Sequence, residues 1–357
     1  MKERTEYLYP VELVEQRRDD LRTKVEGDLG ADVIWAQLVL TEKCSRRCIM
    51  CDYWQSHPQN ELSTDEVKTT LSQLRDLGTQ HVIFLGGEAL LRRDLLEIIQ
   101  YTSSLGIAPE LVTSGFDTPN KVRSFVEAGL RSYIFSIDGP TPQSHNTIRG
   151  FPRLWENLVQ SINNLREIST DDPDIKIKTQ TVAMKQNLFE LDQVIELVGS
   201  LRVHGVSIMP VKGVPNLVPT IEEVKKYNNE VAPKVAEVCK KYNFQVTRLS
   251  IYPFGETSNE IQRAQKGLYN LGSNKIPCIV PWTHTLINPD GAVYTCCSMY
   301  SHKLGNIKEK SISEIWQDEP YRKLRQQMRK LQLPECVSCI ERNDYEAVSQ
   351  EAFSKQQ

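Results

Sequence analysis

The feature that most restricts the fold of this chain is a run of eight residues that contains three cysteines. Cys44, Cys48 and Cys51 have the spacing C-x₃-C-x₂-C. Thiolates are soft ligands, and a short run of them is typical of a zinc site or an iron–sulfur cluster. Structural zinc usually takes four ligands from two nearby pairs, whereas the next cysteine is Cys239 and the nearest histidine is His57. We interpret the run as three ligands of a four-iron cluster with one open iron; a zinc knuckle is the alternative.

Length and composition indicate an ordinary globular protein. With 357 residues, the chain predicts one large domain plus an appendage. The net charge of −3 gives no electrostatic case for a nucleic-acid partner. The sequence shows no apolar run of membrane-spanning length and no signal peptide, which predicts a cytoplasmic protein with no membrane association. Nine cysteines in a reducing compartment favour metal ligation over disulfides.

Strands and helices are predicted to alternate through the first two thirds of the chain. The expected strands cover residues 33–40, 81–85, 110–113, 133–137, 175–182 and 206–210. Ser63 to Glu66 forms a capping box before a helix that ends at Gly78. Such alternation predicts a parallel α/β sheet whose site lies at the carboxyl ends of the strands. A partial (β/α)₆ barrel and a flat doubly wound sheet both fit this pattern.

The character of the sequence changes after the sixth predicted strand. We expect an N-terminal helical extension over 1–32, with its helix near 10–24, and the α/β core over 33–220. One connecting helix is expected over 221–243, a small α+β cysteine-bearing domain over 244–345, and a polar tail over 346–357.

A second group of cysteines lies in that small domain. Pro289, Asp290 and Gly291 separate two apolar runs and predict a hairpin. The hairpin would carry its last residues back beside the first cysteine of the group. Four thiols suffice to hold a complete four-iron cluster, and a zinc ribbon is the alternative. The cysteines of this group are Cys278, Cys296, Cys297, Cys336 and Cys339, and the pattern leaves open whether Cys296 or Cys297 ligates.

The first cysteine run resembles the cluster loop of the radical S-adenosylmethionine (SAM) enzymes. In that family three cysteines hold a [4Fe-4S] cluster whose open iron binds SAM, and reductive cleavage of SAM yields a 5′-deoxyadenosyl radical that abstracts hydrogen from a substrate. The second group resembles the SPASM/twitch appendage of the same family. Because further cysteines are lacking, it is similar to the shorter twitch form, with one auxiliary [4Fe-4S] cluster. The resemblance assigns this cluster to Cys278, Cys296, Cys336 and Cys339.

The resemblance also implies a SAM site. Gly86-Gly87-Glu88 is similar to the family's Gly-Gly-Glu-Pro segment, with Ala89 in place of the proline. A Ser-x-Asp-Gly segment follows the fourth predicted strand, and an arginine that could pair with a carboxylate comes later. The residues that the resemblance assigns to SAM or its surroundings are Gly86, Gly87, Glu88, Ser136, Asp138, Arg149 and Met50.

The resemblance implies an enzyme that acts on an unactivated C–H bond. Too few residues precede the first predicted strand for a peptide-leader domain, so we expect a small polar substrate resembling a sugar or an aminocyclitol, which is oxidised or epimerised. Cys297 is the candidate hydrogen donor for epimerisation. Maturation of a ribosomally made peptide is the alternative, and a non-enzymatic zinc or iron–sulfur protein is a further one. An electron donor such as flavodoxin or ferredoxin is the implied partner.

Overall fold

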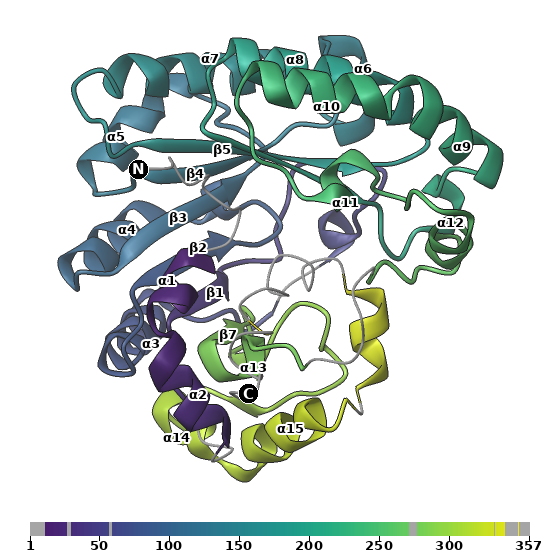
Figure 1. Ribbon diagram of the computed structural model, residues 1–357. Coiled ribbons are helices and arrows are strands. Elements are labelled where there is room, and N and C mark those ends of the chain that lie inside the picture. Colours follow the sequence, from purple (N-terminus) through teal and green to yellow (C-terminus); the bar gives the residue numbers. More distant parts are fainter. Residues whose placement is uncertain are drawn as a thin grey trace.

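The core of the molecule is one mixed β-sheet. The computed structural model describes residues 11–26, 30–56, 59–270, 277–331, 333–339 and 349. Within these ranges nine strands lie side by side in the order β6-β5-β4-β3-β2-β1-β7-β8-β9 (Figure 1). The strands are β1 (Trp35–Val39), β2 (His81–Leu85), β3 (Ala108–Thr113), β4 (Ser132–Ser136), β5 (Lys176–Ala183), β6 (Gly205–Pro210), β7 (His284–Ile287), β8 (Ala292–Tyr294) and β9 (Gly305–Asn306).

The first six strands follow one another in chain order, and each is parallel to the next. A doubly wound sheet would instead reverse its strand order partway across. β1 pairs with β7 on its other edge, and no pairing joins β1 to β6 in the described part of the chain. The predicted partial (β/α)₆ barrel is therefore confirmed, and the barrel is open on one side.

Helices between the strands cover the outer face of this sheet (Figure 1). The first of them, α3, begins with the predicted capping box: Glu66 N donates to Ser63 Oγ (3.3 Å), and Ser63 N donates to Glu66 Oε2 (2.8 Å). The helices of the core are α3 (Thr64–Asp76), α4 (Leu95–Ser104), α5 (Val122–Glu127), α6 (Pro142–Arg149), α7 (Leu154–Ile168) and α8 (Leu191–Ser200). Gly78, with φ of +87°, lets the chain turn away after α3.

Two predictions of single helices are wrong. The segment expected as one helix over 221–243 forms α9 (Ile221–Glu230) and α10 (Ala232–Lys241). The break falls at Val231 because Pro233, near the start of α10, has no amide hydrogen to continue the helix. The N-terminal helix expected near 10–24 is likewise divided into α1 (Val11–Gln16) and α2 (Arg18–Glu26).

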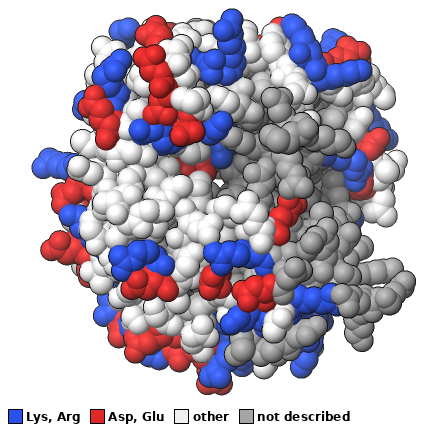
Figure 2. Space-filling view, turned by 60° about the vertical axis from the view of Figure 1, so that its left-hand side comes forward, with Lys and Arg blue, Asp and Glu red and all other residues white. Residues whose placement is uncertain are grey.

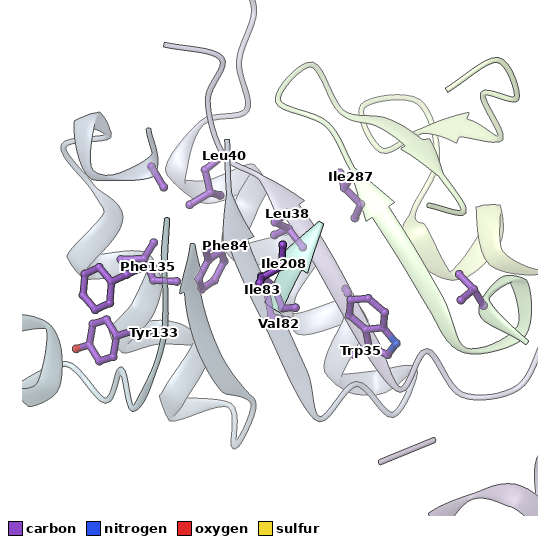
Figure 3. Close-up of a cluster of buried hydrophobic side chains, with 14 of the residues drawn as sticks. Trp35, Leu38, Leu40, Val82, Ile83, Phe84, Tyr133, Phe135, Ile208 and Ile287 are labelled. Carbon is purple, nitrogen blue, oxygen red and sulfur yellow. The ribbon is translucent and has the colours of Figure 1, made fainter. Parts of the chain in front are cut away.

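The C-terminal elements extend the barrel sheet. β7 lies parallel to β1, with Leu38 opposite Ile287, and Figure 3 shows these two side chains in one continuous apolar cluster. The predicted hairpin is confirmed, because β8 returns antiparallel to β7 and Gly291 adopts φ of +86°. The remaining helices here are α11 (Arg248–Ile251), α12 (Ser258–Ala264), α13 (Val280–Thr283), α14 (Ile312–Gln317) and α15 (Glu319–Arg329).

A tryptophan of α14 fastens this part to the N-terminal extension. Trp316 Nε1 donates to Ala31 O at 2.8 Å. The Arg325 guanidinium lies over the rings of Trp316 (4.4 Å) and Tyr321 (4.8 Å), and it donates to Pro281 O at 3.0 Å. Aromatic stacking and hydrogen bonding thus hold the buried cation.

Two observations concern membrane spans and surface charge in the described part of the chain. None of the helices in the described ranges has the length and apolarity needed to cross a bilayer. On the face shown in Figure 2, acidic and basic side chains are interspersed with uncharged ones.

A buried charged network closes the amino end of the barrel. Glu110 on β3 is fully buried, 2.6 Å from Lys178 Nζ and 2.7 Å from His81 Nε2. Burial alone would raise the pKa of Glu110, but Lys178 and His81 lower it to about 2. A cavity of 660 Å³ opens beside the network, at the amino ends of β2 to β5. Because that end of a barrel usually serves stability, we assign the network to the fold.

Replacing Glu110 with Gln tests this assignment. The change removes the carboxylate beside the buried Lys178 ammonium, and we expect a loss of about 3–5 kcal/mol in the free energy of unfolding near pH 7. The pKa of Glu110 is depressed, so its contribution is present above its unfolded value of 4.5 and is lost as the pH falls towards 2. Urea unfolding should therefore show a smaller deficit at about pH 3 than at about pH 7.

The matched control is Glu230→Gln. Glu230 pairs at 3.9 Å with Lys226, and both side chains are more than half exposed. We expect this variant to lose less than about 0.5 kcal/mol at either pH. Equal losses in the two variants would contradict a special role for the network.

Candidate active site

The first cysteine group lies in the loop after β1. Cys48 is buried, and Cys44 and Cys51 are half-buried. The amide of Arg46 donates to Cys44 Sγ at 3.4 Å. Burial raises the pKa of Cys44 to about 11, and the charges of Cys48 and Cys51 act in the same direction. The three thiols are therefore near enough to repel one another as thiolates, and bound iron would offset that repulsion.

The donor set fits an iron–sulfur cluster. In the ranges that the structure describes, no three His, Cys, Asp or Glu side chains converge at the distances that one metal ion requires. A four-iron cluster binds each cysteine through a different iron, so its ligands surround it and need not meet at one point. Thiolates also suit iron–sulfur chemistry by their softness. Cys44, Cys48 and Cys51 would hold three of the irons.

A buried ion pair contacts the cysteine loop at Cys48. Arg149, at the end of α6, places Nη1 3.9 Å from Cys48 Sγ and Nε 2.6 Å from Asp138 Oδ2. Asp138 Oδ1 accepts the amide of Val182 at 2.8 Å. The sequence analysis placed Asp138 and Arg149 against SAM or substrate. In the structure both are buried and their charges face each other, because a buried charge needs a partner.

Gly86 and Gly87 pack against the backbone of the cysteine loop. A Cβ on Gly86 would lie 2.4 Å from Thr41 O, and one on Gly87 would lie 2.4 Å from Lys43 O. Two backbone hydrogen bonds of 2.8 Å join the segments, from Gly87 N to Thr41 O and from Glu88 N to Lys43 O. The glycines thus permit two chain segments to meet, a different reason from the approach to a ligand that the sequence suggested.

The carboxylate of Glu88 is buried and accepts hydrogen bonds from residues at the end of β3. It accepts hydrogen bonds from Thr113 Oγ1 (2.8 Å), Ser114 Oγ (2.6 Å) and Ser114 N (3.1 Å). Glu88 therefore fixes β3 relative to the Gly-Gly turn. Sequence reasoning missed Thr113 and Ser114, since a Thr-Ser pair after a strand has no distinctive pattern.

Arg46 is a second residue that sequence reasoning missed. It lies inside the cysteine run, yet its side chain is buried. It donates to Ser114 Oγ (3.1 Å) and Asp117 Oδ1 (2.7 Å) and stacks 4.1 Å above the ring of Phe151. Arg46 therefore attaches the cysteine loop to the segment that follows β3.

The remaining candidate SAM residues lie at the carboxyl ends of the strands. Ser136 ends β4, half-buried, opposite Gln180 of β5. Gln180 Nε2 donates to Met209 Sδ on β6 at 2.9 Å. Met50 is half-buried and packs against the core. These partly exposed side chains are all uncharged.

The second cysteine group is brought together by the hairpin and by one glutamate. His284 Nδ1 lies 2.7 Å from Thr295 O, so Cys296 returns beside the segment that leads into β7. Glu335, in the 3₁₀ turn Pro334–Ser338, binds Ser301 (2.8 Å) and His302 (3.0 Å). These bonds join the turn that follows Cys296 to the turn that carries the last two cysteines. Cys278 is buried, and Cys296, Cys297, Cys336 and Cys339 are half-buried.

The turn 297–300 faces the open side of the barrel. Lys212, just after β6, donates to Ser298 Oγ at 3.2 Å. The hydroxyl groups of Tyr300 and Tyr53 are hydrogen-bonded to each other, and Tyr53 lies in the 3₁₀ turn Tyr53–Gln55 after the first cysteine run. Burial raises the pKa of Tyr53, and the charge of Cys297 contributes to the rise. Cys297 therefore lies within electrostatic reach of Tyr53, two positions after Cys51.

Exposed apolar side chains lie close in sequence to both cysteine groups. Ile49, Trp54 and Tyr300 are 42%, 39% and 43% exposed. Arg47 lies 5.9 Å from the ring of Trp54. All three apolar residues lie within three positions of a cysteine, and we call them the apolar rim. Large apolar side chains that stay in water commonly mark a binding surface.

Comparison with known proteins places this geometry in a family. The radical SAM superfamily model matches residues 38–198, and the model of the SPASM iron–sulfur cluster-binding domain matches residues 278–340. The chain belongs to the radical SAM superfamily and carries a C-terminal SPASM domain. These domains imply SAM, a SAM-binding [4Fe-4S] cluster and auxiliary iron–sulfur chemistry as cofactors.

Particular relatives share most of the chain. A PqqA peptide cyclase of Rhizobium meliloti is 29% identical, over 78% of this chain and 72% of the relative. An AdoMet-dependent heme synthase of Methanosarcina barkeri is 27% identical, over 80% and 83%. Streptococcus suis SuiB bound to its precursor peptide SuiA superposes with a TM-score of 0.62 at 16% identity, over 96% of this chain and 78% of SuiB. This last likeness shows the fold.

The buried ion pair gives a prediction that needs no cofactor. Arg149→Met leaves the Asp138 carboxylate buried without its guanidinium, and we expect a loss of about 3–5 kcal/mol in unfolding free energy. Arg149→Met combined with Asp138→Asn removes both charges and should recover most of the loss. Urea unfolding of the metal-free protein near pH 7 measures these two variants and Asp138→Asn alone. Additive losses would show that the two side chains do not act as a pair.

Proposed function

We propose that this radical SAM enzyme abstracts hydrogen from an unactivated C–H bond of its substrate. When bound, the cluster and SAM supply a carbon radical that can do this. The observation that carries the proposal is the convergence of the cysteine run, the Gly-Gly-Glu turn and the Asp138–Arg149 pair at the carboxyl end of the barrel. Cys44, Cys48 and Cys51 hold the metal, and Arg149 positions Cys48. Half-buried Ser136 and Met50 would contact SAM.

The substrate that the site supports best is a peptide side chain. The apolar rim Ile49, Trp54 and Tyr300 gives an extended substrate a surface outside the barrel. The PqqA peptide cyclase among the relatives and the peptide bound by SuiB agree with this choice. A neutral hydroxylated substrate such as a sugar is the second candidate, since Ser136 and Gln180 offer uncharged hydrogen-bonding groups where the strands end.

Anaerobic reconstitution tests the enzyme class. Two four-iron clusters require about eight irons per chain. Replacing Cys44, Cys48 and Cys51 with Ala should halve the iron content and abolish 5′-deoxyadenosine formation from SAM and dithionite. The matched control is Cys239→Ala, because Cys239 is buried in α10 among apolar neighbours. Iron-free protein with stoichiometric zinc would contradict the proposal.

A substrate panel separates the two substrate classes. A peptide that carries a leader segment should stimulate 5′-deoxyadenosine formation with saturation, whereas sugars and cyclitols should not. The reverse pattern would assign the small polar substrate that the sequence analysis expected. Trp54→Ala should raise KM for the peptide with little effect on kcat if the rim binds the substrate.

Replacing Cys297 separates the two possible outcomes of the reaction, oxidation and epimerisation. We propose oxidation, in which the substrate radical loses an electron and a proton, and the auxiliary site on Cys278, Cys296, Cys336 and Cys339 accepts that electron. Cys297→Ala should then leave product formation nearly intact. If Cys297 instead returns a hydrogen atom, the variant stops turnover while 5′-deoxyadenosine still forms. Wild-type enzyme in D₂O would then give deuterated, epimerised product, because a thiol exchanges its hydrogen with solvent.

A further inference from the structure

A groove of 450 Å³ opens between the segments that follow β2 and β3. Its lining includes two leucines whose side chains are partly exposed to water, Leu91 and Leu96, each 40% exposed. Phe116 and Phe125 line the opposite side. The SAM and substrate residues described above do not account for this exposed apolar surface.

The charges around the groove are predominantly positive. Four cations line it, Arg46, Arg92, Arg93 and Lys121, against two carboxylates, Glu88 and Asp117. Both carboxylates are already engaged, Glu88 by the end of β3 and Asp117 by Arg46.

Three of the nearby cations are available to a partner. Arg93 and Lys121 are exposed, as is Arg123 on the first turn of α5. In the described part of the chain, no acidic side chain forms an ion pair with any of these three. A partner with acidic side chains around an apolar patch would therefore complement the groove.

The floor of the groove reaches the cysteine loop. Arg46 lines it, and Arg46 lies two positions from Cys44 and two from Cys48. A protein seated here would come close to the first cysteine group without entering the barrel. That position suits electron delivery, whereas a substrate must enter the mouth of the barrel itself.

We propose that this groove is the docking surface for an acidic one-electron carrier protein. The inference rests on the proposed function, whose reaction consumes an electron from outside the enzyme. In each transfer the reduced carrier loses one electron and the enzyme gains it. Leu91 and Leu96 supply apolar contact, and Arg93 and Lys121 orient the acidic partner.

The experiment measures binding of purified flavodoxin to the reconstituted enzyme by calorimetry at low ionic strength. Arg93→Glu with Lys121→Glu should weaken binding by about tenfold or more, since both charges change sign at the contact. The matched control is Lys234→Glu with Lys240→Glu, two exposed lysines of α10. That control should stay within about twofold of the wild type, because its charges lie outside the contact.

Two further arms separate docking from catalysis and folding. With dithionite as reductant, which needs no docking, both double variants should cleave SAM at the wild-type rate. Leu91→Ser with Leu96→Ser should weaken flavodoxin binding at low and at high salt, because apolar contact is not screened.

Wild-type binding by the groove variant, or an equal loss in the control, would overturn the docking surface. Loss of dithionite-driven SAM cleavage in the groove variant would overturn it too, because its charges would then belong to the active site. Failure of every protein, wild type included, to cleave SAM with dithionite would instead refute the proposed function. The binding comparison would still decide the surface.

Discussion

The site depends on one close contact between two backbones. The Gly86–Glu88 turn lies against Thr41 to Lys43 so tightly that a single Cβ on either glycine would clash. Two hydrogen bonds form only at that separation. This contact fixes the segment after β1 relative to the segment after β2. The three cysteines follow directly in the segment after β1, so the contact also fixes where their loop begins. The side chains of Arg46, Glu88 and Arg149 then stabilise a loop whose position the backbone contact has already determined.

The sequence predicted regular elements well because their patterns are local. The six strands of the barrel lie where the alternation placed them, with ends shifted by at most two residues. The capping box at Ser63 and the hairpin around Gly291 were readable because each depends on residues only a few positions apart. The cysteine groups were readable because few other roles explain thiols so closely spaced. Strand order, which separates a barrel from a doubly wound sheet, required the structure.

Contacts between distant segments were not readable from the sequence. Arg46 and Arg149 are arginines near cysteines, and nothing local says that one reaches Asp117 while the other pairs with Asp138. The sequence gives no sign of the buried network at Glu110 either, because a glutamate within a strand usually points to solvent. In each case burial forced a charge to find a partner far along the chain. Such choices depend on the packing of the whole fold.

The pairing of β7 with β1 has a consequence for how this architecture can vary. Two cysteine-bearing units are attached to neighbouring strands, and adjacent strands stay about 4.8 Å apart whatever joins them. The long stretch of chain between β6 and β7 leaves the sheet at its β6 edge and re-enters beside β1. Insertions or deletions in that stretch would change the size of the protein without altering the pairing of β1 with β7. The connection between β6 and β7 can therefore vary in length, in evolution or by engineering, while β1 and β7 remain paired.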